Sequence, residues 1–241
     1  SVSTHGAGAG LICTPELAKE ILRACRRATI DIAAGRSAAE AGVHPDIVAW
    51  LEKRSPHATG ALDDSKRSPL PISVKTRLGY DRAITEEWMS HLLETEPDCI
   101  TLHGRTLNQM YSGRADWDEI GKAAALIHRE RPETVFLGNG DIDSLDDARQ
   151  KTADYKLDGV LVGRATFGNP WFFGGHQPTP EERLAAAAEH AELYEAIFGG
   201  GPKVFAPMKK HLGWYCKGFP GSKELRLELM EKINALGVGA Q

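Results

Sequence analysis

Cys99-Ile100-Thr101-Leu102-His103 is a short run of apolar and β-branched residues that ends in a histidine. This pattern predicts a buried strand, because strands are short and rich in such residues. Two stretches with helical spacing flank it, one from near Ile84 to near Thr95 and one from Trp117 to Arg129. A strand that alternates with helices of about 10–15 residues is typical of βα units around a parallel sheet.

The same alternation predicts three further strands. One precedes the first helix and two follow the second helix, with Ser144 as the N-cap residue of a third helix between them. Four parallel βα units are half of the roughly eight that close a (β/α)₈ barrel. The sequence therefore predicts an α/β fold, the C-terminal half of a (β/α)₈ TIM barrel, followed by an all-α helical domain. The three further strands are residues 71–77, 134–138 and 159–163.

Two regions lie outside this alternation. Residues 29–70 are rich in Ala, Ser, Asp and Pro, with one amphipathic piece at 47–51, and we interpret them as an insertion or a partly ordered excursion. From residue 179 the pattern is purely helical, because Thr179-Pro180-Glu181-Glu182 combines a proline at the first helical position with acids in the first turn. A Gly-Gly-Gly-Pro break at 199–202 separates this helix from a second helical stretch, Val204 to Leu236.

The composition argues against several classes of protein. A hydrophobic content of 41% with 26% charged residues is ordinary for a globular protein, so a packed core is expected. No run of about 18 apolar residues occurs, so no membrane span is predicted. The four cysteines contain no CxxC pair, which argues against a zinc site and against a disulfide framework. We expect free thiols in a cytoplasmic, monomeric protein without metal. These cysteines are Cys13, Cys25, Cys99 and Cys216.

Polar and small residues follow each predicted strand. Lys75 and His103 lie at the ends of the first two strands, while Asn139-Gly140-Asp141 and Gly163-Arg164 follow the other two. A lone Lys or His at a strand end is more often solvated or structural than functional. The carboxyl ends of parallel βα units, however, meet at one edge, where barrels place active sites and phosphate-binding loops. Cations beside exposed backbone N–H groups suit a phosphorylated cofactor.

Several motifs together resemble the tRNA-dihydrouridine synthases, most closely the bacterial B-type members. The runs HGRT, GNGDI and VGRA in this order at βα spacing are very specific, although any one alone would be weak. Apart from 29–70, the resemblance covers nearly the whole chain. The motifs are Gly6-Ala7-Gly8-Ala9-Gly10-Leu11, Val74-Lys75-Thr76-Arg77-Leu78-Gly79, Leu102-His103-Gly104-Arg105-Thr106, Gly138-Asn139-Gly140-Asp141-Ile142, Val162-Gly163-Arg164-Ala165, Gly168-Asn169-Pro170-Trp171, Lys209-Lys210-His211 and Trp214-Tyr215-Cys216-Lys217-Gly218.

The resemblance implies a flavin mononucleotide (FMN) cofactor and reduction of the C5=C6 bond of uridine in tRNA. By it, NADPH reduces the flavin, the flavin gives hydride to C6, and a cysteine protonates C5. A base in folded tRNA must leave its stack to reach the flavin. Lys75 and His103 would contact the flavin, and its phosphate end would be held by Asn139, Gly140, Asp141, Gly163 and Arg164.

The sequence departs from the family pattern in one respect that bears on catalysis. In the family the proton-donating cysteine lies in an Asn-x-Gly-Cys-Pro loop before the glycine run that starts at Gly6, and none of the four cysteines occupies that place. We therefore expect the donor upstream of residue 1, in a chain truncated at its N-terminus and inactive alone. The expected domains are a remnant loop and helix at 1–28, an insertion at 29–70, a flavin-binding half-barrel at 71–175 and a helical tRNA-binding domain at 176–241.

A basic segment near the C-terminus favours RNA as the partner. The whole chain carries a net charge of −4, yet residues 203–226 hold six basic side chains against one acid, Glu224. Basic residues interleaved with Trp214 and Tyr215 suit phosphate contacts and base stacking. The simpler interpretation is a solvated helix face whose aromatic residues belong to the core. The expected tRNA contacts are Arg77, Arg105, Lys209, Lys210, His211, Lys217 and Arg226.

Two other functions remain open from the sequence. One is another FMN-dependent barrel oxidoreductase, such as a dihydroorotate dehydrogenase relative, although an enzyme with a small substrate does not need a basic, aromatic tail. The other is a non-catalytic RNA-binding remnant that keeps the tail and lacks the cysteine.

Overall fold

The structure is a computed structural model that describes residues 6–54, 68–199 and 201–238. The chain forms two compact units, one of residues 1–140 and 151–161 and the other of residues 141–150 and 162–241. No helix in the described ranges is both long enough and apolar enough to cross a membrane.

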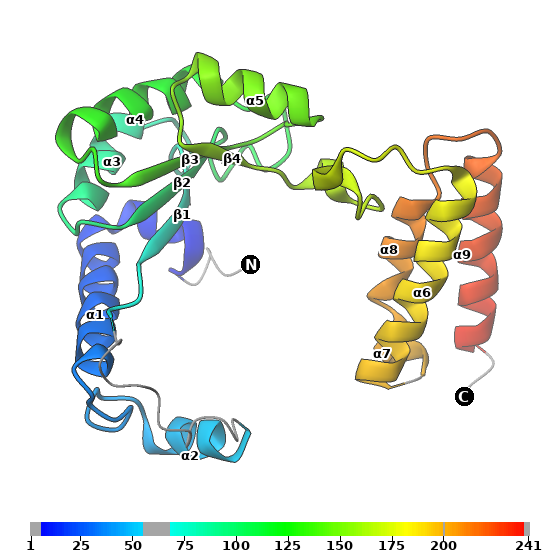
Figure 1. The fold of residues 1–241 in the computed structure, drawn as a ribbon, viewed down its shortest axis with the longest axis horizontal. Coiled ribbons are helices and arrows are strands. Elements are labelled where there is room, and N and C mark those ends of the chain that lie inside the picture. Colours follow the sequence, from blue (N-terminus) through cyan, green and yellow to red (C-terminus); the bar gives the residue numbers. More distant parts are fainter. Residues whose placement is uncertain (1–5, 55–67, 200, 239–241) are drawn as a thin grey trace. The chain divides into compact units, whose positions relative to one another are not determined.

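The first unit begins with helices and then alternates strands with helices (Figure 1). The alternation produces four strands, and the predicted third helix begins after Ser144, whose hydroxyl accepts a hydrogen bond from the Asp147 amide at 3.0 Å. The elements up to the last strand are η2 (Gly8–Cys13), α1 (Pro15–Ala33), α2 (Pro45–Arg54), β1 (Ser73–Arg77), α3 (Thr85–Leu93), β2 (Cys99–His103), α4 (Trp117–Glu130), β3 (Val135–Asn139), α5 (Leu145–Asp154) and β4 (Gly159–Leu161). The residues of α5 before 151 belong to the second unit.

The four strands form one parallel sheet in the order β1-β2-β3-β4. Each strand pairs with the next strand in the chain, as βα units require. The predicted fold class is confirmed: four consecutive parallel βα units are followed by helices. Lys75, however, does not end β1. The strand continues to Arg77, because Arg77 pairs with His103 of β2.

One face of the sheet is buried beneath helices α3 and α4, which pack on each other. Ile100, Leu102 and Phe136 point to this face and are fully buried. The indole nitrogen of Trp88 in α3 donates to the hydroxyl of Thr76 in β1 at 2.9 Å, which ties the helix layer to the sheet. The other face carries the alternate residues of each strand, and on it Lys75 is exposed. Side chains on this second face are therefore available to a ligand.

Residues 29–70 are only partly an excursion. Helix α1 extends to Ala33, and the amphipathic piece at 47–51 lies in α2. Residues 55–67 lie outside the described part of the chain.

The second unit is mainly helical: η4 (Arg164–Thr166), η5 (Phe172–Gly174), α6 (Pro180–Phe198), α7 (Pro202–Phe205), α8 (Met208–Tyr215) and α9 (Ser222–Val238). Helix α6 begins at the predicted place with a full capping box between Thr179 and Glu182. Its core is formed by Ala187 of α6 with Met208, Leu212 and Tyr215 of α8.

The predicted helical stretch from Val204 to Leu236 is divided among three helices, α7, α8 and α9. Pro207 precedes α8 and has no N–H group to continue the helix before it. Between α8 and α9, Gly218 and Gly221 have φ of 83° and 78°, which is the left-handed region that glycine tolerates. The turns at these positions produce the separate helices.

Candidate functional site

Side chains from three strands form one row at the carboxyl edge of the sheet. Arg77 of β1 pairs in register with His103 of β2, which pairs with Asn139 of β3, which pairs with Leu161 of β4. Lys75 lies two residues before Arg77 and so points to the same face of the sheet. The structure therefore brings Lys75, Arg77, His103 and Asn139 together in the first unit, with Arg77 in the place that we had predicted for Lys75.

Lys75 and Arg77 make this face of β1 electropositive. Loss of surrounding water lowers the pKa of the Lys75 ammonium, and the charge of Arg77 lowers it further. Burial also lowers the pKa of the Arg77 guanidinium. The Arg77 guanidinium donates a hydrogen bond to the Thr106 carbonyl oxygen at 2.9 Å, which orients it. Two partly desolvated cations on one face favour an anionic ligand, because a negative charge beside them stabilises their charged forms.

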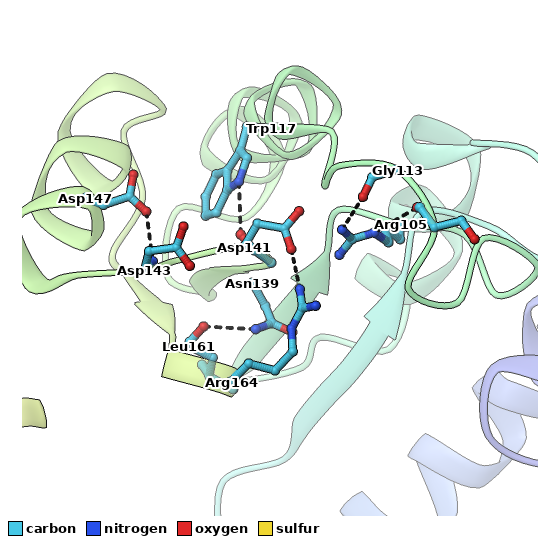
Figure 2. A network of polar contacts seen from close by, with 11 residues as sticks. Arg105, Gly113, Trp117, Asn139, Asp141, Asp143, Asp147, Leu161 and Arg164 are labelled. Carbon is cyan, nitrogen blue, oxygen red and sulfur yellow. Dashed lines mark hydrogen bonds and ion pairs between the residues drawn. The ribbon is translucent and has the colours of Figure 1, made fainter. Parts of the chain in front are cut away.

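His103 lies beside a glycine that has room for no side chain. Gly140 has a φ of 134°, and a Cβ added there would lie 2.6 Å from the Cβ of Ala115 and 3.7 Å from Nε2 of His103. The Gly140 carbonyl oxygen accepts a hydrogen bond from Nε1 of Trp117 at 3.1 Å, as Figure 2 shows. The turn after β3 is thus held by α4, and the imidazole of His103 approaches its backbone closely.

The Asn139 side chain ties two strands together. Its amide nitrogen Nδ2 donates to the Leu161 carbonyl oxygen at 2.9 Å, at the point where β4 ends (Figure 2). The backbone carbonyl of Asn139 accepts from the Gly104 amide at 2.9 Å. Asn139 therefore links the last residue of β4 and the residue that follows β2 within the first unit.

In the second unit, Arg164 pairs with Asp141. Its Nη2 donates to Oδ1 of the carboxylate, and about half of the guanidinium side chain stays exposed. Asp141 adopts a left-handed backbone with φ of 51°. A Cβ added at the neighbouring Gly163 would meet nothing within 4 Å, so the approach to its backbone is open. The pair orients a half-exposed guanidinium, the group that binds phosphate most specifically.

Arg105 has a different role from the one predicted. It is only 2% exposed, and its guanidinium donates from Nε to the Ser112 carbonyl at 3.2 Å and from Nη2 to the Gly113 carbonyl at 2.6 Å (Figure 2). A buried guanidinium cannot meet an RNA phosphate. The expectation of a direct tRNA contact is therefore wrong for Arg105, which shapes the loop before α4.

The basic residues of the helical unit fall into two groups. Lys210, Lys217 and Arg226 are exposed, whereas His211 is half-buried and lines a cavity. The Lys210 ammonium lies 5.9 Å from the centroid of the Trp214 ring, at the outer limit of a cation–π contact. Lys209 also lies on α8, and the side chain of Lys203 is outside the described part of the chain.

Sequence reasoning missed this cavity in the helical unit. It has a volume of about 150 Å³ and lies between the segment after β4, α6 and α8. Its polar lining residues include Asn169, His190 and His211, which are far apart in the sequence, so no local sequence pattern predicts the cavity. The Gly168-Asn169-Pro170-Trp171 motif was the one available signal, and it carried no assigned role.

The cysteines lie away from the row on the sheet. Cys99 is the first residue of β2, at the strand end opposite His103. Cys216 is buried at the end of α8, and burial raises the pKa of its thiol. Cys13 and Cys25 are exposed on η2 and α1. Within the described ranges, His, Cys, Asp and Glu form no group of three that could hold a metal ion.

Comparison with known proteins identifies the family. The family model for dihydrouridine synthase matches residues 58–237, most of the chain. The chain belongs to the dihydrouridine synthase family. This match sets aside the alternative of a different flavin-dependent barrel, and it spans both the strands that carry the row and the helical unit.

Curated relatives agree with the family match. A probable tRNA-dihydrouridine synthase 2 of Bacillus subtilis is 27% identical over 95% of this chain and 59% of its own length. A probable tRNA-dihydrouridine synthase 1 of Synechocystis is 33% identical over 70% of this chain and 49% of its own length. A probable tRNA-dihydrouridine synthase of Rickettsia conorii is 36% identical over 65% of this chain and 50% of its own. The chain thus spans about half to three fifths of the length of these relatives.

Proposed function

We propose that the protein takes part in the reduction of uridine to 5,6-dihydrouridine in tRNA, with FMN as cofactor and NADPH as reductant. The observation that carries the proposal is the row of Arg77, His103 and Asn139 at the carboxyl edge of the sheet, with Lys75 on the same face. In this row the resemblance implies Lys75 and His103 as contacts of the flavin and Asn139 as a contact of its phosphate end, and Arg77 as a contact of the tRNA.

The residues present fit a flavin nucleotide. A ring system with polar edges suits a face that offers an ammonium, a guanidinium and an imidazole, and the lack of a Cβ at Gly140 lets the turn after β3 pass close to His103. The half-exposed guanidinium of Arg164, oriented by Asp141, suits the cofactor phosphate. We propose that Lys75 and His103 contact the ring, and that Asn139, Gly140, Asp141, Gly163 and Arg164 hold the phosphate end.

When bound, FMN would supply hydride to C6 of the uracil ring. The contribution of this chain is to bind and orient. Lys75 and Arg77 supply positive charge on the exposed face of the sheet, and electrostatic groups fixed before the reaction are usually the largest source of catalysis. None of the four strands carries a cysteine at its carboxyl end. We therefore expect the proton for C5 to come from a group outside these strands, and the 241 residues alone not to reduce uridine.

The helical unit is proposed to bind tRNA through phosphates. Its exposed cations Lys210, Lys217 and Arg226 lie on or beside α8 and α9. Phosphate contacts position a nucleic acid without reading its sequence. This unit would hold the tRNA while the uracil base leaves its stack.

The proposal is tested in the cell that makes the protein. Deletion of the gene is expected to lower the dihydrouridine content of total tRNA, measured by mass spectrometry. Restoration of the gene is expected to bring this content back to its original level. Restoration with His103→Ala is expected to leave the content low. Tyr155→Phe, which removes only a hydroxyl that donates to Asp118 at 3.3 Å and keeps the half-buried ring, serves as the control variant. An unchanged dihydrouridine content after deletion would overturn the proposal.

A further inference from the structure

The cavity of the helical unit is the size of one six-membered ring. Its volume is about 150 Å³, and a cavity of roughly that volume accommodates a benzene molecule. A pyrimidine base is one such six-membered ring, whereas a purine carries a second, fused ring. Pro170 at its rim is exposed, and His190, His211 and Trp214 in its wall are half-buried, so the cavity reaches the surface.

The wall of the cavity contains a polar atom that lacks a partner. Oδ1 of Asn169 is buried and makes no hydrogen bond within the described part of the chain. A buried carbonyl oxygen without a donor is costly, so natural proteins keep few of them, and each needs an explanation. A ligand that donates an N–H group at this point would satisfy it.

Two imidazoles add further polar groups. Nδ1 of His190 lies 3.3 Å from the hydroxyl of Tyr215, and the rings of His190 and His211 meet edge to face with centroids 5.5 Å apart. Burial lowers the pKa of His211, and the charges of His190 and Lys210 lower it further. A neutral imidazole has one donor and one acceptor nitrogen. The cavity therefore suits a ring with both donors and acceptors on its edge.

The cavity walls are fixed without a ligand. Phe167 and Trp214 stack with centroids 4.0 Å apart, and a Cβ at Gly168 would lie 2.3 Å from the Trp214 carbonyl oxygen. Nη1 of Arg183 donates to the Gly168 carbonyl at 2.9 Å. Ligand sites are usually preformed in this manner.

Positive charge borders the cavity. Lys210 lies 5.9 Å from the ring of Trp214 in the cavity wall, and its charge lowers the pKa of His211. A ring joined to phosphates is therefore favoured over a neutral aromatic molecule. We propose that this cavity binds one unpaired pyrimidine base of an RNA strand, through Asn169 and His211, as a second base-binding site built wholly within the helical unit. The inference rests on the proposed RNA-binding role of this unit.

The test compares two fluorescently labelled RNA pentamers, one of uridine and one of adenosine, bound to the 241-residue chain. Fluorescence anisotropy at fixed salt is expected to show that oligouridylate binds on the order of tenfold more tightly, because one satisfied buried hydrogen bond is worth about that factor. Asn169→Leu is expected to abolish the preference without lowering the melting temperature, because it removes an unpaired polar atom. Asn108→Leu, the same change at an exposed asparagine of the first unit, should keep the preference. If Asn169→Leu fails to fold, Asn169→Ser, which adds no bulk, takes its place.

The outcomes separate this inference from the proposed function. Lys209→Ala with Lys210→Ala should weaken both pentamers alike and leave their ratio unchanged. Equal binding of the two pentamers by the unaltered chain, or a preference that survives loss of the Asn169 amide, overturns the base-binding site and leaves phosphate-mediated tRNA binding intact. If the chain binds neither pentamer and does not bind whole tRNA, the base-binding site and the proposed tRNA binding are both overturned.

Discussion

Nε1 of Trp117 lies 3.1 Å from the carbonyl oxygen of Gly140 and donates a hydrogen bond to it. This bond joins the first residue of α4 to the turn after β3, which also approaches the imidazole of His103. The indole also packs against β3, since a Cβ at Gly138 would lie 2.8 Å from its ring. A tryptophan of the helix layer thereby sets the shape of a turn on the candidate site.

Trp117→Phe is expected to keep most of this packing and to lose the hydrogen bond. The Gly140 carbonyl would then lack its donor, a loss that costs about 1–3 kcal/mol and shifts the melting temperature by several degrees. FMN affinity, measured by fluorescence titration, should fall as well. Trp50→Phe in α2 is the matched control because Trp50 is 55% exposed, and it should leave both quantities unchanged. Equal effects of the two substitutions would contradict the role of the bond.

Gly140→Ala is expected to destabilise the first unit. The new Cβ would lie 2.6 Å from the Cβ of Ala115, and φ of 134° is a backbone conformation that alanine rarely adopts. Strain of this kind costs on the order of 1–3 kcal/mol, measurable by urea unfolding. Gly163→Ala is the control, because its Cβ would meet nothing within 4 Å. A Gly140→Ala protein as stable as the Gly163→Ala protein would show that the turn relaxes freely.

Lys75→Met is expected to separate stability from ligand binding. Because folding lowers the pKa of Lys75, the folded chain disfavours its charged form, so loss of the charge should not reduce the free energy of unfolding. FMN affinity should nevertheless fall. Lys122→Met is the control: contact with Glu119 raises the pKa of Lys122, so this change should cost a little stability and leave FMN affinity unaltered. A Lys75→Met protein that binds FMN as tightly as the parent would remove Lys75 from the site.

Asp98 should make the first unit sensitive to acid. Its carboxylate accepts a hydrogen bond from the Ile72 amide at 2.6 Å and pairs with Arg26 at 2.7 Å, and these contacts lower its pKa. The stability that they contribute is present above the ordinary carboxyl pKa of 3.8 and is lost as the pH falls through the lowered folded value. Asp98→Asn should therefore flatten the decline of stability below about pH 5, followed by circular dichroism. If Asp98→Asn and the parent lose stability over the same pH range, Asp98 does not cause the sensitivity to acid.

Removal of the charges of Lys209 and Lys210 together should flatten the dependence of tRNA affinity on salt. Each phosphate contact contributes about 0.7–0.9 to the slope of log K against log salt, so a double alanine variant should lose roughly 1–2 units. Different tRNAs should weaken alike. The measurement is tRNA binding at several salt concentrations, with Lys53→Ala in α2 as the control. An unchanged slope would show that these lysines form a solvated face and that RNA docks elsewhere.

Much of the fold could be predicted because its signals are local. The apolar runs that became β1 to β4, the N-cap at Ser144 and the capping box at Thr179 all depend on residues close in sequence. The start of β1 at Ser73 and the place of Lys75 within the strand could not be predicted, because pairing with β2 sets them.

The candidate site was predicted less completely, because more of it depends on contacts between residues that are distant in sequence. Sequence reasoning found the strand ends, yet it took Arg105 for an RNA contact, since nothing local indicates that its guanidinium is enclosed by the Ser112 and Gly113 carbonyls. The cavity around Asn169 escaped notice because its walls come from separate helices. Burial and long-range contacts determine the enclosure of Arg105 and the cavity around Asn169, and a short sequence motif gives information on neither.

The shared register of β1, β2 and β3 has a consequence for how the gene can vary. Successive residues of a strand point to opposite faces, so one codon inserted within β2 would turn the side chain of His103 toward the buried helix layer and expose an apolar neighbour in its place. Insertions and deletions within these strands are thus tolerated only in pairs of residues, if at all. Length differences among homologous genes should therefore accumulate in the connections between strands and helices, and a sequence alignment should show the three strands free of gaps.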